Sequence, residues 1–355
     1  MASAPEITIT APVLTGCVER IYAAAGVPPA TARLTAESLV AANLRGVDSH
    51  GAQLTVWYIE RILAGDMDPR AEGRVVSEDG CVMVYDGQNG IGQRVSEICC
   101  GHAVRIARER GMAAVSARES NHFGAAAWWA QKMADAGQIG IVFCNASTIV
   151  PPWQGREPRL GTNPLCMAVP GPWLLDMATT TVAMNRIYKA HMDGYHAIPT
   201  GWALDSGGVP TTDPAAAIKG MPMPLGGYKG SGLGMMVEIL CSVISGGAHR
   251  EEVAGIHVKG RKSRASQMFI ALDVARFMPV EEFRARLEHL LTYVKSSAPA
   301  PGYDEVMVAG DPEWRCEAER LRSGILLGQG TWDALCKTAA RLGVEMPDVS
   351  VRTSA

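Results

Sequence analysis

The sequence of 355 residues lacks the short motifs that would identify a function directly. It has no C-x-x-C pair, no H-E-x-x-H and no G-x-S-x-G, which excludes the usual signatures of a redox dithiol, a zinc peptidase and a serine hydrolase. Its histidines and cysteines form no cluster at metal-ligand spacing, so we expect no metal. Because the nine cysteines are odd in number and most lie in apolar runs, we expect free thiols in a cytoplasmic protein.

The sequence also lacks an excess of one charge. With 33 basic and 36 acidic residues, it does not have the basic surplus of a dedicated nucleic-acid-binding protein. The longest charge-free run, residues 137–155, contains prolines and polar residues, which predicts a strand and a loop rather than a membrane span. We therefore expect a small-molecule ligand, and neither a nucleic acid nor a membrane as partner.

Hydrophobic residues make up 47% of the chain, and their spacing predicts an α/β protein with a helical start. Residues 1–75 are expected to be all-helical and to pack with C-terminal helices within 280–345. Strands and helices alternate through the α/β region expected at 76–279, where 233–244 is predicted to be a buried helix.

Two glycine-rich segments resemble phosphate-binding loops without matching their spacing. Residues 87–92 follow a predicted strand and open a helix, but the pattern is G-x-x-G-x-G, which predicts a tight turn rather than a Rossmann site. Residues 226–232 place Lys229 between glycines just before a helix. That arrangement is compatible with contact to a phosphate and with a flexible surface turn.

Two histidines lie where catalytic side chains are common. His50 follows Asp48 and Ser49 at the entrance of a predicted helix, where these residues are also good helix caps. His122 lies in the loop after a predicted strand, and loops at the carboxyl ends of strands often carry ligand-binding residues in α/β proteins. Each histidine is compatible with a structural and with a catalytic role.

Taken together, several segments resemble the type 2 malate/L-lactate dehydrogenase family, which includes ureidoglycolate, sulfolactate and diketogulonate dehydrogenases and cyclic ketimine reductases. The match runs in order over about residues 10–345. Its segments are RGVDSHG (45–51), SNHFG (120–124), GTNP (161–164), DMATT (176–180), IPTGWALD (198–205), GGYKGSGL (226–233) and APAPGYDEV (298–306).

The resemblance implies a fold and a chemistry that composition alone does not. The fold would be the family's non-Rossmann NAD(P)-binding α/β architecture, a mixed sheet flanked by helices. The cofactor would be NAD or NADP, the assembly a homodimer, and the reaction a hydride transfer between nicotinamide and a 2-oxo or 2-hydroxy acid. A histidine whose pKa is near neutrality suits the accompanying proton transfer in both directions.

The resemblance also implies roles for individual residues. His50 becomes the candidate acid/base, with Ser49 beside it, and His122 matches a second histidine that has the proton role in some members. Thr162 and Asn163 match residues that line the substrate pocket. Cofactor contacts are implied for Ser120, Asp176, Met177, Ala178, Tyr228, Lys229, Gly302, Tyr303 and Asp304.

One substrate-binding position departs from the family pattern. Four residues after His50 the family usually has an arginine that resembles a clamp for the substrate carboxylate, and here that residue is Leu54. We therefore expect a substrate other than simple malate or lactate, held by a different cation such as Arg45 or Arg186, or more apolar.

Two alternative functions follow from the same departure. The chain is compatible with an NADPH-dependent cyclic imine (ketimine) reductase, which would act on a C=N carbon. It is also compatible with a catalytically silent cofactor-binding protein that kept the scaffold. The sequence does not choose between NAD and NADP.

Overall fold

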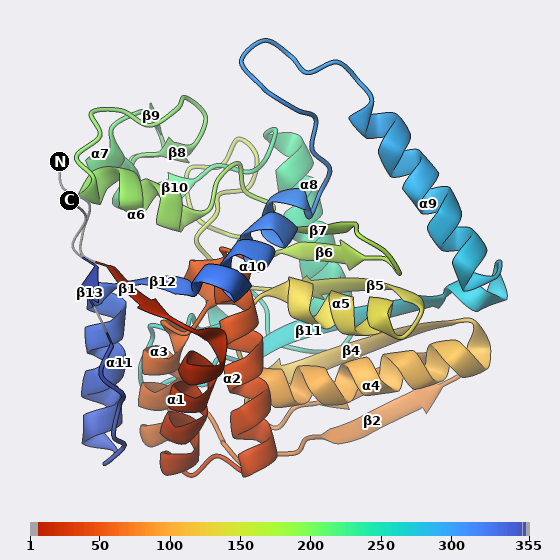
Figure 1. Cartoon of the computed structure of the whole chain (residues 1–355), viewed down its shortest axis with the longest axis horizontal. Helices are drawn as coiled ribbons and strands as arrows, with labels where there is room; N and C mark the ends of the chain where they lie inside the picture. Colours follow the sequence, from red (N-terminus) through yellow and green to blue (C-terminus); the bar gives the residue numbers. More distant parts are fainter. Residues whose placement is uncertain (1–5, 350, 353–355) are drawn as a thin grey trace.

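A seven-stranded mixed sheet forms the centre of the protein (Figure 1). The computed structural model describes residues 6–349 and 351–352. The strand order is β2-β3-β4-β11-β5-β6-β7, in which β3 and β4 are parallel and every other neighbouring pair is antiparallel. The strands are β2 (Arg74–Asp79), β3 (Val82–Asp86), β4 (Met112–Ser120), β5 (Gln138–Cys144), β6 (Leu165–Ala168), β7 (Leu174–Met177) and β11 (Ala265–Asp273).

Helices cover both faces of this sheet. On one face, α4 (Gly92–Arg110) and α5 (Ala126–Asp135) bury a core that includes Val115, Trp129 and Phe269. On the other face, α8 (Tyr228–Glu238) and the π-helix η2 (Ile239–Val243) pack on Phe143 and Met268. The mixed sheet between helices confirms the predicted α/β class.

The N-terminal region forms a second core beside the sheet. It consists of α1 (Ala11–Ala24), α2 (Pro29–Leu44), the 3₁₀ turn η1 (Asp48–His50) and α3 (Leu54–Leu63), packed with α11 (Gln329–Arg341). The helix α10 (Asp311–Ser323) lies beside α2.

The expectation of an all-helical start is wrong for one segment. The strand β1 (Glu6–Ile9) pairs with β12 (Ile325–Gly328) and with β13 (Val351–Arg352). Ile7 and Ile9 face the second core. Both partner strands come from the far end of the chain, so local sequence carried little sign of this pairing.

The predicted packing of 280–345 on the N-terminal region is also only partly correct. The helix α9 (Val280–Lys295) begins beside the 3₁₀ turn η4 (Val274–Arg276) and extends away from the N-terminal helices (Figure 1). Only Leu291 of this helix is buried. Helical spacing predicts that a helix forms but does not specify which element it covers.

A small lobe lies between β7 and α8. Its core contains Ile187, Ile198 and Ala217. The elements are α6 (Met184–Met192), β8 (Ala203–Leu204), β9 (Pro210–Thr211), α7 (Pro214–Ile218) and β10 (Met221–Pro222), and the short turn η3 (Arg250–Glu252) follows η2. In the described part of the chain, no helix has the length and apolarity needed to cross a membrane.

Candidate functional site

Two histidines from different parts of the fold meet in the structure. His50 comes from η1 in the N-terminal region, and His122 comes from the loop between β4 and α5. Their ring centroids are 5.6 Å apart, and the ring planes differ by 26°. The pair therefore lies where the helical core and the sheet core join.

The turn that carries His50 is held by a partly buried polar network. The Asn43 side chain donates to Asp48 at 2.6 Å and accepts from the Ala52 backbone N–H at 2.7 Å. Arg320 of α10 donates to both Asp48 carboxylate oxygens, at 2.7 and 3.1 Å. Because the acceptor is charged, these bonds are stronger than neutral ones. They fix η1, and Ser49 Oγ then lies 2.9 Å from His50 Nδ1.

The hydrogen bonds of His122 determine its tautomer. The Tyr58 hydroxyl lies 2.5 Å from His122 Nδ1, and the Gly124 backbone N–H donates to the same nitrogen at 3.3 Å. A backbone N–H can only donate, so Nδ1 is an acceptor. Burial raises the pKa of Tyr58 above its ordinary range, which keeps its hydroxyl protonated. A neutral His122 ring therefore carries its proton on Nε2.

Because Gly92 has no side chain, the turn at 87–92 can pack closely against the loop that carries His122. A Cβ atom at Gly92 would lie 2.3 Å from the His122 carbonyl oxygen and 2.5 Å from that of Asn121. The Asn121 side chain donates to the carbonyls of Asn89 and Gly90, at 3.0 and 2.8 Å. The turn predicted at 87–92 therefore exists, and it packs against the backbone of a site residue.

Burial controls protonation of the histidine pair. Burial, with smaller contributions from the neighbouring rings of His50 and His257, lowers the pKa of His122 to about 3. Burial also lowers the pKa of His50 below its ordinary value. Two imidazolium ions this close would repel each other in a poorly solvated site. The pair therefore accepts at most one proton, and His50 is the better place for it, because His122 also experiences the neighbouring rings.

A cleft of about 630 Å³ opens beside His50. This volume is typical of a small-molecule or cofactor site. The N-terminal turns of α5 and α10 both border the cleft, and helix N-termini favour anions. The lining includes Arg45, Ser49, His50, Ala125 to Trp128, Gln131, Thr162, Asp176, Met177, Ala178, Val308 to Gly310, Glu313, Trp314 and Glu317.

Polar atoms in the cleft lack protein partners. Arg45 stacks on Trp314 at 4.1 Å, yet one of its guanidinium nitrogens has no hydrogen-bond partner. The Trp128 ring nitrogen and the Gln131 amide oxygen are also buried and unpartnered. Buried polar groups normally find partners. These atoms therefore fit a large ligand with several polar groups.

Asp176 lies at the end of β7 beside the start of α5. Its carboxylate accepts a hydrogen bond from the Ala127 N–H at 2.8 Å. Enclosure by the cleft walls raises the pKa of Asp176 to about 6, against the lowering effects of this hydrogen bond and of Arg45. At pH 8 the group is therefore an acceptor with a negative charge.

The structure brings together part of the residue set predicted from the sequence. His50, Ser49, Thr162, Asp176, Met177 and Ala178 line the cleft, and His122 stacks on His50. Six other predicted contacts lie outside the lining of the cleft. Ser120 is fully buried at the end of β4, and the others are Tyr228, Lys229, Gly302, Tyr303 and Asp304, which are exposed.

The sequence predicts that Asn163 lines the substrate pocket. In the structure its side chain makes hydrogen bonds within the protein. Its amide donates to the Gly234 carbonyl at 2.9 Å and to Glu238 at 3.0 Å, and its oxygen accepts from the Ala146 N–H at 2.9 Å. The side chain is fully buried. Its polar atoms are already used within the protein.

Leu54 is buried in the N-terminal core, one helical turn before Tyr58 on α3. Residues four apart share a helix face, so Leu54 lies on the side of α3 that carries the hydroxyl bonded to His122. Of the two cations expected to replace the missing arginine, Arg45 is held by Trp314 and Arg186 is exposed on α6. Arg45 lines the cleft beside His50, whereas Arg186 does not.

Sequence reasoning missed Tyr58, Trp128, Gln131 and the segment 308–317 as site residues. The spacing of Leu54 and Tyr58 on one helix face was the available signal for Tyr58. The other residues come from elements that only tertiary packing brings to the cleft.

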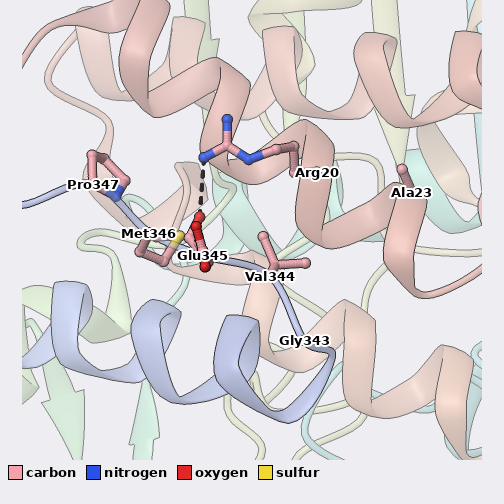
Figure 2. Close-up of a pocket in the computed structure, with 7 residues that line it drawn as sticks. All are labelled: Arg20, Ala23, Gly343, Val344, Glu345, Met346 and Pro347. Atoms are coloured by element: carbon pink, nitrogen blue, oxygen red, sulfur yellow. Dashed lines mark hydrogen bonds between the residues drawn. The ribbon is translucent and has the colours of Figure 1, made fainter.

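A second pocket lies on the surface between α1 and the segment after α11 (Figure 2). It has a volume of about 700 Å³ and is lined by residues 343–347 with Arg20 and Ala23. Arg20 donates to the Glu345 carbonyl at 3.3 Å, as Figure 2 shows. Its lining includes neither His50 nor His122.

Comparisons with known proteins agree with this geometry. A family model described as malate/L-lactate dehydrogenase matches residues 9–336. A malate dehydrogenase of Pyrococcus horikoshii is 34% identical, with 92% of this chain and 93% of the relative covered.

Two solved structures are also similar. The sulfolactate dehydrogenase of Methanocaldococcus jannaschii has a TM-score of 0.91 at 32% identity, covering 96% of this chain and 98% of that one. The delta1-piperideine-2-carboxylate reductase of Pseudomonas syringae pathovar tomato has a TM-score of 0.81 at 26% identity, covering 94% and 99%.

We predict that Gly92→Ala destabilises the protein, because its methyl group would overlap the His122 carbonyl. Overpacking of this kind costs about 1–3 kcal/mol. Gly101→Ala, on the same helix with no neighbouring atom within 4 Å, is the matched control and should stabilise by about 1 kcal/mol. Urea unfolding measures both variants. Equal stability of Gly92→Ala and the native protein would contradict the close approach.

Proposed function

The chain belongs to the malate/L-lactate dehydrogenase family and is therefore an oxidoreductase of hydroxy acids, and from this premise we propose how it works. The cleft binds a nicotinamide dinucleotide, and the His50–His122 pair moves the proton while a 2-oxo acid and its 2-hydroxy acid interconvert. The observation that carries this proposal is the pair of stacked, poorly solvated imidazoles at the edge of a cleft with unpartnered polar atoms.

The residues of the cleft fit such a cofactor. Asp176 offers a carboxylate to ribose hydroxyls, and the N-terminal turn of α5, which has no acidic residue, favours a pyrophosphate. Arg45, Trp128 and Gln131 have the unpartnered atoms that a dinucleotide can satisfy. When bound, the dinucleotide supplies or accepts the hydride.

The two histidines have different roles in the proposed reaction. His122 is neutral and directs its Nε2–H away from Tyr58, so it acts as a hydrogen-bond donor that polarises the substrate carbonyl. His50 donates a proton to the oxygen during reduction and takes it back during oxidation. In reduction, a 2-oxo acid, a hydride and a proton together give the 2-hydroxy acid.

We predict that His50→Ala lowers kcat by at least about 100-fold, the usual contribution of a general acid or base. His122→Gln, which keeps a hydrogen-bond donor, should lose less activity than His122→Ala. Steady-state rates of NADH oxidation with a 2-oxo acid measure both effects.

Cofactor titration distinguishes a loss of catalysis in the histidine variants from a loss of cofactor binding. All three variants should bind NADH with nearly native affinity, and His289→Ala, an exposed histidine on α9, should keep native kcat. Full activity of both alanine variants at His50 and His122 would overturn the assignment of the proton to this pair.

We also propose that the cofactor is NAD rather than NADP. Among the described residues that line the cleft, Arg45 is the only lysine or arginine, whereas Asp176, Glu313 and Glu317 are carboxylates. An additional 2′-phosphate would meet negative charge.

NADH is therefore expected to bind at least about tenfold more tightly than NADPH, a difference of about 1.4 kcal/mol. Fluorescence titration at pH 8, above the pKa of Asp176, measures both dissociation constants. Tighter binding of NADPH would contradict this preference.

The helix predicted to be buried at 233–244 leaves one apolar face uncovered. Met235, Ile239 and Val243 recur every four residues along α8 and η2, and each is more than half exposed. An exposed apolar stripe marks an association surface. We propose that a second copy of the chain covers this stripe and forms the homodimer.

Ile239→Asp should convert the dimer into monomers, because a carboxylate would be buried without a partner. Light scattering after size-exclusion chromatography measures the mass, and Met112→Asp on the exposed start of β4 is the control. A native protein that is monomeric at micromolar concentration would contradict the proposed dimer.

Cyclic imine reduction is the second candidate function. The similarity to the reductase from Pseudomonas syringae supports it. It would yield a cyclic amino acid from a cyclic imino acid without turnover of linear 2-oxo acids.

A further inference from the structure

We propose that Arg320 is a positioning residue for His50, and that α10 uses it to hold the turn of His50 beside the cofactor cleft. Arg320 touches neither cofactor nor substrate and acts through the carboxylate of Asp48. This inference rests on the role proposed for His50, and it deepens that role by naming the group that sets the position of the ring and the charge near it.

The helix α10 borders two places with its two ends. Glu313, Trp314 and Glu317 in its first turns line the cleft. Arg320 follows Glu317 by one turn, lies outside the lining of the cleft and reaches Asp48. One helix therefore joins the wall of the cleft to the turn that carries His50.

The segment 43–48 packs along α10. The Arg45 guanidinium stacks on Trp314 at 4.1 Å near the start of the helix. In the middle of the helix, a Cβ atom at Gly46 would lie 3.0 Å from the Cys316 Sγ atom. The backbone before His50 therefore has little room to move while α10 is in place.

The contact between Arg320 and Asp48 fixes orientation as well as distance. Two different guanidinium nitrogens donate to the two carboxylate oxygens, at 2.7 and 3.1 Å. Arg320 also donates to the backbone carbonyl of Asn43. Its side chain is only 18% exposed, so water screens this pair less than it screens a surface ion pair. A forked contact of this kind is specific to arginine, because a lysine has a single charged nitrogen.

Asn43 holds the same turn independently of Arg320. Its side chain donates to Asp48 at 2.6 Å and accepts from the Ala52 N–H at 2.7 Å. It packs closely on the residue after His50, since a Cβ atom at Gly51 would lie 2.3 Å from the Asn43 Oδ1 atom. Without Arg320 the turn should therefore stay attached to α2 and lose its precise orientation.

The Arg320–Asp48 pair also sets the charge near the acid/base. Asp48 lies two residues before His50, and a carboxylate without its partner favours a protonated imidazole. A guanidinium without its partner has the opposite effect. Other titratable groups also border this turn, and they stay unchanged in the variants compared. They are Arg45 and Glu317 on the cleft side, Glu6 and Cys316 toward the outside, and His122 across the ring stack.

The first test separates catalysis from cofactor binding. We expect Arg320→Ala to lower kcat for NADH oxidation with a 2-oxo acid about tenfold or more, because a misplacement of about 1 Å can cost about 100-fold. The dissociation constant of NADH should stay nearly native. Arg320→Lys keeps the charge without the fork and should recover part of kcat. Arg322→Ala, an exposed arginine in the same turn of α10, is the matched control and should keep native kcat.

The second test uses the pH dependence of kcat, which a purely structural role would not move in opposite directions. Reduction needs the protonated form of His50, so the rate falls as pH rises through the pKa of this ring. Arg320→Ala leaves Asp48 unpaired and should move the falling limb to higher pH by about half a unit. Asp48→Asn leaves Arg320 unpaired and should move the same limb to lower pH.

Two results would overturn the positioning role. One is native kcat in Arg320→Ala, and the other is a falling limb that both variants leave in place or move in the same direction. Either result leaves the proposed function standing if His50→Ala abolishes turnover, whereas full activity of His50→Ala would overturn the proposed function itself. Urea unfolding shows whether each variant is folded. If Arg320→Ala is not, Arg320→Lys and Asp48→Asn decide the question by their kcat and by the direction in which each moves the limb.

Discussion

The stacking of two imidazoles in one poorly solvated place is the constraint on which the site depends. At 5.6 Å between centroids, His50 and His122 cannot both be charged without a large electrostatic cost. Burial makes His122 the ring that stays neutral, since its pKa is lowered to about 3. In the proposed reaction, the proton on His122 Nε2 polarises the substrate carbonyl, whereas the proton on His50 is transferred.

The fold holds this pair by supporting each ring from a different core. His50 belongs to the helical core, where Asn43 and Arg320 fix Asp48 and the turn around it. His122 belongs to the sheet, where the loop after β4 packs on the backbone of Gly92. Tyr58 joins the two cores, because it is buried among the helices and its hydroxyl bonds to the ring from the sheet.

The cleft and α3 lie on different parts of the fold around the histidine pair. On one side of His50, the cleft presents helix N-termini, carboxylates and unpartnered polar atoms, which suit a large and polar cofactor. On α3, Leu54 is buried in the helical core, and Trp57 packs against the ring of His257. In the proposed reaction, hydride and proton therefore approach the substrate from groups that different parts of the fold position.

The sequence by itself determined the class of the fold, the positions of most helices and strands, and both histidines of the pair. These features depend on local periodicity, on glycine turns and on short motifs, which a single chain segment contains. The glycines at 87–92 predicted a turn, but the sequence did not show that Gly92 supports His122. Only the tertiary structure paired β1 with β12, directed α9 away from the N-terminal helices, gave Asn163 a structural role and brought His257 to Trp57. Such contacts join residues far apart in the chain, and their formation depends on packing and burial that no local pattern specifies.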